Sequence, residues 1–199
     1  MPVERALARG AAVVAAGLLA AAAAQAQPSA ERLAACAACH GASGNSPSPA
    51  IPSIAGQPRV FIENQLVIMR EGLREVPVMA PVLKGLTDEE ISALAKHFSA
   101  LPVVPAVAPV QAEKQRAGAE ISRKALCGTC HLATYSGQNQ VPRLAGQHED
   151  YLLLAMKAFR DQPGPGRDTI MAATLRGMND TELGHLAHYF SQAPIAPAK

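Results

Sequence analysis

The residues best suited to do chemistry are four cysteines, arranged as two pairs that are each followed directly by a histidine. The motifs are Cys36-Ala-Ala-Cys39-His40 and Cys127-Gly-Thr-Cys130-His131. The pattern C-x-x-C-H is the signature of covalent c-type haem attachment. Two thiols one helical turn apart can add to the two vinyl groups on one porphyrin edge, and the adjacent histidine can then bind the iron from one side. The motifs therefore predict two covalently bound haem c groups.

Three other uses of paired cysteines have to be weighed. Four cysteines in an exported protein could form two disulfides, and a C-x-x-C pair can be a thioredoxin-like redox site, although that site needs a βαβ setting. Four thiolates could also bind one zinc ion, but 87 residues separate the two pairs. All three alternatives leave the adjacent histidines unexplained, so the spacing favours haem.

The chain after residue 26 is a tandem repeat. The cysteine motif recurs after 91 residues, the segment Ile51–Gln57 (IPSIAGQ) recurs as Val141–Gln147 (VPRLAGQ) after 90, and Met79–Glu90 recurs as Met171–Glu182 after 92. Such similar shifts indicate a duplicated domain with small changes in its loops. Between the copies, Pro102, Pro105 and Pro109 predict an extended connector. The predicted organisation is a cleaved signal peptide (1–26), a first domain (27–101), a proline-rich linker (102–112), a second domain (113–193) and a flexible tail (194–199).

The N-terminus has the three parts of a secretory signal peptide. Arg5 and Arg9 precede an apolar run from Ala11 to Ala24, and Ala24-Gln25-Ala26 fits the cleavage site. A membrane anchor is the alternative, but 14 apolar residues are short for a span, which needs about 20. The sequence therefore predicts export, with Gln27 as the first mature residue.

Composition excludes several classes of protein. The 199 residues are 49% hydrophobic and 17% charged, with a formal net charge of +2, which argues against disorder along the whole length and against a nucleic-acid-binding surface. No stretch after residue 26 is apolar enough to span a membrane. Four Phe, three Tyr and no Trp are few for two small cores, so a large apolar cofactor would supply what the side chains lack.

The coarse secondary structure is predicted to be all-α. Thr87 with Glu90 and Asn179 with Glu182 read as capping boxes that start the last helix of each half. Helical spacing of apolar residues predicts further helices over 58–73 and 148–161, and another over about 113–127. The counterpart of this last helix in the first half, from Ser29 to Cys36, is much shorter.

The repeat separates the methionines that could bind iron from those that fill cores. Met79 and Met171 align with each other, 39 and 40 residues after their histidines, and each is expected in a loop before the last helix. Met69, Met156 and Met178 instead align with other apolar residues, as core positions do. We therefore predict His40 and Met79 as the axial ligands of one iron, and His131 and Met171 as those of the other.

Pro52 and Pro142 follow these histidines by 12 and 11 residues. A loop carbonyl at this place could accept the free ring N–H of the histidine and fix its orientation. A proline that only shapes the loop is the alternative. The position of the prolines alone favours neither interpretation.

Together these motifs resemble tandem class I cytochrome c domains, and specifically the dihaem cytochrome c4 family, over nearly all of residues 30–192. The resemblance implies thioether bonds at Cys36, Cys39, Cys127 and Cys130, together with the axial ligands and proline carbonyls named above. Two departures stand out. Gln27 occupies the position of Gly118, a residue that the family uses for close helix packing, and Leu132 replaces the usual glycine after the histidine, so that its loop could be shaped differently.

The resemblance also implies a function. Members of the family carry electrons in the periplasm of Gram-negative bacteria, often loosely attached to the inner membrane, from donors such as a quinol-oxidising complex to terminal oxidases. The expected role is thus an electron carrier rather than an enzyme. The alternative is the electron-accepting cytochrome subunit of a periplasmic dehydrogenase. A dihaem enzyme would need an open or unusual axial position, for which the sequence gives no sign.

Overall fold

The structure is a computed structural model that describes residues 27–105 and 108–195. Within these two stretches the chain forms nine α-helices, one isolated bridge between Gln138 and Val141, and no β-strand, so the all-α prediction is confirmed. The helices are α2 (Ala30–His40), α3 (Arg59–Arg70), α4 (Ala80–Leu83), α5 (Asp88–Ser99), α6 (Ala112–Lys124), α7 (Cys127–His131), α8 (Glu149–Asp161), α9 (Thr169–Leu175) and α10 (Asp180–Ser191). The predicted signal peptide lies outside the described residues.

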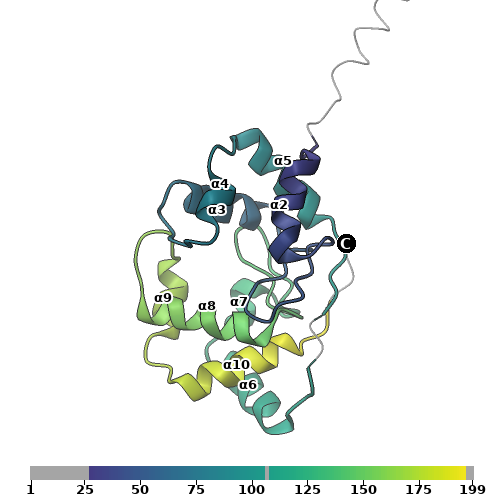
Figure 1. The fold of residues 1–199 in the computed structure, drawn as a ribbon. Coiled ribbons are helices and arrows are strands. Elements are labelled where there is room, and N and C mark those ends of the chain that lie inside the picture. Colours follow the sequence, from purple (N-terminus) through teal and green to yellow (C-terminus); the bar gives the residue numbers. More distant parts are fainter. Residues whose placement is uncertain (1–26, 106–107, 196–199) are drawn as a thin grey trace, which may run out of the picture.

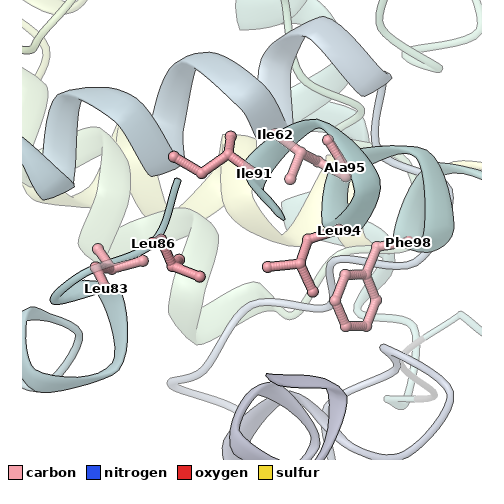
Figure 2. Packing of buried hydrophobic residues seen from close by; sticks show 7 residues of the cluster. All are labelled: Ile62, Leu83, Leu86, Ile91, Leu94, Ala95 and Phe98. Carbon is pink, nitrogen blue, oxygen red and sulfur yellow. The ribbon is translucent and has the colours of Figure 1, made fainter. Parts of the chain in front are cut away.

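The helices form two groups that correspond to the two copies of the repeat. Helices α2–α5 lie together in one half of the molecule and α6–α10 in the other, as Figure 1 shows. Each group has its own hydrophobic core. In the first half the buried cluster is built around Ile91, Leu94 and Phe98 of α5 (Figure 2). In the second half, Leu183, Leu186 and Phe190 of α10 take the equivalent places.

Both predicted capping boxes are present. The Thr87 side chain accepts from the backbone N–H of Glu90, while the Glu90 carboxylate accepts from the backbone N–H of Thr87. Asn179 and Glu182 repeat this exchange at the start of α10. Because these bonds satisfy backbone donors that a helix start leaves unpaired, they fix where the last helix of each half begins.

The helices that lead into the cysteine motifs differ between the halves. In the first half, α2 runs without a break from Ala30 through the motif to His40. In the second half, α6 ends at Lys124, three residues before the predicted end, and α7 starts anew at Cys127. The break falls at Leu126, whose φ of 57° is left-handed and cannot continue a helix.

Helix α6 packs closely on α10 through Gly118, which is buried. A Cβ at this position would lie 2.5 Å from the Cβ of Tyr189 and would collide with the carbonyl oxygen of His185. In the first half, Gln27 precedes α2 and is not helical. An ion pair of 3.1 Å between Arg32 and Glu90 joins α2 to α5 instead. The second half therefore has a close helix crossing that the first half lacks.

The expectation that both methionines lie in loops holds for Met79, which is in a turn just before α4, and is wrong for Met171, which lies inside the short helix α9. Met79 is the N-cap residue of α4, and Met171 lies in the first turn of α9. Pro81 falls in the first turn of α4, a position that proline favours. The Asp168 side chain caps α9 by accepting from the backbone N–H of Met171 at 2.8 Å.

The linker between the halves is held at both ends, and none of its described residues before Ala112 is helical. Asn45 of the first half donates to the carbonyl of Pro102 and accepts from the N–H of Val104. At the other end, the N–H of Gln111 donates to Nε2 of His188 at 3.0 Å. No helix in the described residues is long and apolar enough to cross a membrane.

Candidate haem-attachment sites

The cysteine motif of each half lies on a helix whose end the histidine forms. Cys36 and His40 are four residues apart on α2, as are Cys127 and His131 on α7, so each cysteine shares a helix face with its histidine. None of the four cysteines forms a disulfide. The first of each pair is half-buried and the second is exposed. Burial raises the pKa of the Cys36 and Cys127 thiols above the usual value.

Each histidine donates to a proline carbonyl. Nδ1 of His40 lies 2.8 Å from the oxygen of Pro52, and Nδ1 of His131 lies 2.9 Å from that of Pro142. Because a carbonyl can only accept, Nδ1 carries the proton and Nε2 keeps its lone pair. Both histidines are buried, and this burial lowers their pKa values despite the opposing hydrogen bonds. The rings are therefore neutral and oriented, as a metal-binding imidazole must be.

An apolar cavity in the first half brings a cysteine and a methionine together. It lies between α2, α3, α4 and α5, and its walls include Cys36, Leu66, Met79 and Leu94. Both Cys36 and Met79 also pack against the core of that half. In the second half, Cys127 and Met171 pack against the equivalent core. A thiol and a thioether thus border the same apolar region in each half, and the histidine lies on the thiol's helix.

Arg143 provides a further observation on what these sites can hold. Its guanidinium is buried, and burial lowers the pKa of the group to about 10. Two of its nitrogens donate to the carbonyls of Ala55 and Ala145, but Nε has no hydrogen-bond partner. A buried cation with an unused donor needs an anion, and a haem propionate would supply one. The thiols, neutral imidazoles, thioethers and this cation fit haem c.

The residue after each histidine has the same backbone conformation in both halves. Gly41 has φ 79° and ψ 152°, and Leu132 has φ 67° and ψ 159°. The expectation that Leu132 could change the shape of its loop is therefore wrong at this residue. The leucine adopts a conformation that suits glycine, which costs a residue with a Cβ about 1–3 kcal/mol.

Replacing Leu132 with glycine should therefore stabilise the second half. We expect Leu132→Gly to raise the free energy of unfolding by about 1 kcal/mol, because relief of strain exceeds the entropy that glycine adds to the unfolded chain. Leu132→Ala is the matched control, since it removes the side chain but keeps the Cβ. Chemical denaturation measures both. If the glycine variant were no more stable than the alanine variant, strain at this position would be ruled out.

Sequence reasoning missed three side chains that lie between the two sites. The amide of Gln57 bonds the backbone of Arg143, next to Pro142 in the second half. The amide of Gln147 bonds the backbone of Ser53, next to Pro52 in the first half. Arg143 bonds the backbone of both halves. The signal that could have found the glutamines is the Ala-Gly-Gln sequence that ends the repeated segment Ile51–Gln57 and its copy Val141–Gln147.

Comparisons with known proteins agree with this geometry. Residues 115–194 match the family model described as cytochrome c, and residues 22–97 match that of subunit III of cbb3-type cytochrome c oxidase. Cytochrome c4 of Thiocapsa roseopersicina is 33% identical in an alignment of 166 positions that covers 77% of this chain and 84% of that protein. The thiosulfate dehydrogenase electron acceptor of Thiomonas intermedia is 32% identical in an alignment of 180 positions that covers 83% of this chain and 82% of that protein.

A solved structure shows the same arrangement over the full length of its chain. The crystal structure of reduced recombinant cytochrome c4 from Pseudomonas stutzeri superposes with a TM-score of 0.75 at 25% identity. The match covers 85% of this chain and 100% of that one. The similarity therefore extends to both halves and to their arrangement, not only to the cysteine motifs.

Proposed function

The chain belongs to the dihaem cytochrome c4 family, and from this premise we propose that it carries electrons between a respiratory donor and a terminal oxidase in the periplasm. As a member of the family it binds two covalent haem c groups, one in each half. Haem iron, when bound, accepts and releases one electron at a time.

The observation that carries the proposal is the matched set of donors in the two halves. His40 and His131 are both neutral, buried and oriented by a carbonyl, and Met79 and Met171 each border a core against which a motif cysteine also packs. We assign the histidines and methionines as axial ligands, and the four motif cysteines as the thioether sites. Ligands on both faces leave no position for a substrate, which suits electron transfer rather than catalysis at the iron.

The export of the protein is part of the same proposal. The predicted signal peptide would deliver the chain to the periplasm, where c-type haem attachment takes place in the organisms best known for it. The described helices include none that could span a membrane, so any attachment of the mature chain to the inner membrane would be peripheral.

Mass spectrometry of the purified protein tests the attachment sites. We expect two haem additions on a chain that begins at Gln27, because both motifs are complete. Acid–acetone extraction should leave the colour with the protein. Replacing both cysteines of one motif with serine should remove one addition and leave the other. A parent protein with a single addition, or colour that passes into the solvent, would contradict the assignment.

A redox titration followed by optical spectroscopy tests the function itself. We expect two reversible one-electron transitions, and we expect membranes that contain a terminal oxidase to reoxidise the reduced protein faster than air does. If the protein titrates reversibly but such membranes leave it reduced, it is an electron carrier for another acceptor.

A second role is favoured by the similarity to the thiosulfate dehydrogenase electron acceptor of Thiomonas intermedia. In that role the protein would accept electrons as the cytochrome subunit of a periplasmic dehydrogenase. Co-purification distinguishes the two roles, because a subunit stays with its catalytic partner through several columns whereas a diffusible carrier does not.

Docking to redox partners should depend only weakly on salt. Residues 27–104 carry 6 basic and 7 acidic groups, and residues 105–199 carry 10 and 8. Many of these charges pair within the protein, as in the contacts of Arg70 with Asp88 and of Arg160 with Asp180. We therefore expect the rate of reduction by a partner to change modestly between low and physiological ionic strength. A steep fall with added salt would instead show a concentrated charged patch at the docking site.

A further inference from the structure

The peptide groups that orient the two histidines are each shared with the opposite half of the molecule. The carbonyl of Pro52 accepts from His40, and the N–H of the same peptide unit belongs to Ser53. That N–H donates to Oε1 of Gln147 at 2.9 Å, and Nε2 of Gln147 donates to the Ser53 carbonyl at the same distance. A side chain of the second half thus holds the peptide that orients the histidine of the first.

The reverse arrangement exists with the halves exchanged. The Pro142 carbonyl accepts from His131, and the N–H of that peptide unit, on Arg143, donates to Oε1 of Gln57 at 2.9 Å. Nε2 of Gln57 donates to the Arg143 carbonyl at 3.0 Å. Both glutamines are buried, with exposed fractions of 4% for Gln57 and 2% for Gln147. Gln57 and Gln147 occupy equivalent places in the repeat. Each half therefore uses the same glutamine to bond the same peptide of the opposite half.

A peptide unit transmits polarisation between its N–H and its carbonyl, because its C–N bond has partial double-bond character. An acceptor on the N–H makes the carbonyl oxygen more negative, and consecutive hydrogen bonds strengthen one another in this way. The histidine N–H then donates more strongly, which makes the ring a more basic ligand. A more basic histidine stabilises ferric over ferrous iron, so it lowers the reduction potential.

We propose that Gln147 and Gln57 are positioning residues that set the reduction potential of the haem in the opposite half, each acting through the peptide that accepts from the axial histidine. The inference rests on the proposed function, because it takes His40 and His131 as iron ligands. Through these contacts, the reduction potential of each haem depends on how the two halves are docked.

The test is a redox titration of the full-length dihaem protein carrying Gln147→Leu. Leucine cannot accept from Ser53 N–H, so the Pro52 carbonyl becomes a weaker acceptor and the potential of the His40 haem rises. We expect the ratio of reduced to oxidised iron at this haem to increase roughly three- to tenfold at a fixed ambient potential, where tenfold corresponds to about 59 mV for one electron. NMR signals of the two axial methionine methyl groups report the two haems separately.

A general loosening of the contact between the halves would move the potentials of both haems, whereas the proposed role moves only one of them. Gln147 belongs to the second half but its amide bonds Ser53 of the first half, so Gln147→Leu should move the potential of the His40 haem and leave that of the His131 haem in place. Gln57→Leu should give the mirror result and raise the potential of the His131 haem. Hydrogen exchange of the Ser53 N–H supplies a readout apart from the potential, because this proton loses its acceptor in Gln147→Leu but not in Gln57→Leu.

Two further variants keep the test decisive. Gln147→Glu retains an oxygen acceptor for Ser53 N–H, so it should leave the potential of the His40 haem unchanged or lower it, even if the leucine variant folds poorly. His148→Leu is the matched control, since it removes a 2.9 Å bond between the halves, from the His148 ring to the Ser46 carbonyl, that involves no histidine-bound peptide. It should leave both potentials in place.

Three outcomes would overturn the inference: no shift with Gln147→Leu, a shift confined to the His131 haem, or an equal rise with Gln147→Glu or His148→Leu. Each of these leaves the proposed function intact, provided that the parent titrates as a reversible two-haem carrier. Failure of the parent to do so would instead overturn the proposed function itself.

Discussion

Met171→Ala is expected to abolish the near-infrared sulfur-to-ferric band of one haem while the band of the other haem persists. Loss of the thioether opens one axial position and lowers the potential of that haem, because methionine ligation favours the reduced state. Met79→Ala should do the same to the haem of the first half. Near-infrared spectroscopy of the oxidised protein, combined with a redox titration, measures both effects.

The structure supplies the control for this experiment. Met156 is buried in the core of the second half, where its exposed fraction is 5%. Met156→Ala should cost about 2–5 kcal/mol of stability by leaving a cavity, yet protein that still folds should retain both sulfur bands. Met171 is only half-buried and borders the same core, as a residue that faces a cofactor would.

The contrary pattern would be decisive. If Met156→Ala removes a sulfur band and Met171→Ala leaves both bands in place, the axial assignment in the second half is wrong. If either Met79→Ala or Met171→Ala removes both bands together, the two sites are not independent, and the reading of each half as a separate haem site fails.

The parts of the fold that could be predicted are those that short sequence patterns encode. The capping pairs Thr87–Glu90 and Asn179–Glu182 start their helices as expected, because both partners lie within one turn of each other. The tandem repeat also revealed which methionines are equivalent, since alignment of the two copies needs no knowledge of their packing.

The parts that could not be predicted depend on contacts between distant residues. Leu132 takes a glycine-like conformation because its loop must leave the helix in the same direction as at Gly41, and nothing in the local sequence requires this. Gln57 and Gln147 are ordinary polar residues in the sequence. Their role between the halves appears only when residues 86 or 94 positions apart meet.

The second large effect is expected from Gly118→Ala. A Cβ on this residue of α6 would collide with the carbonyl oxygen of His185 and lie 2.8 Å from the carbonyl carbon of that residue on α10. These are backbone atoms, so the collision cannot be relieved by a side-chain rotation, and the two helices must separate. Overpacking of a core costs about 1–3 kcal/mol, and occasionally more. We expect the upper end of this range, measured by chemical denaturation of the holoprotein.

Gly184→Ala is the matched control, because Gly184 lies on α10 of the same helix pair but has no heavy atom within 4 Å of its added Cβ. There the substitution should stabilise the protein by about 0.5–1 kcal/mol, as alanine is the better helix former. Opposite signs for the two variants would show that close approach, rather than loss of glycine itself, determines the cost at Gly118. A Gly118→Ala protein as stable as the parent would mean that α6 and α10 do not depend on their close contact.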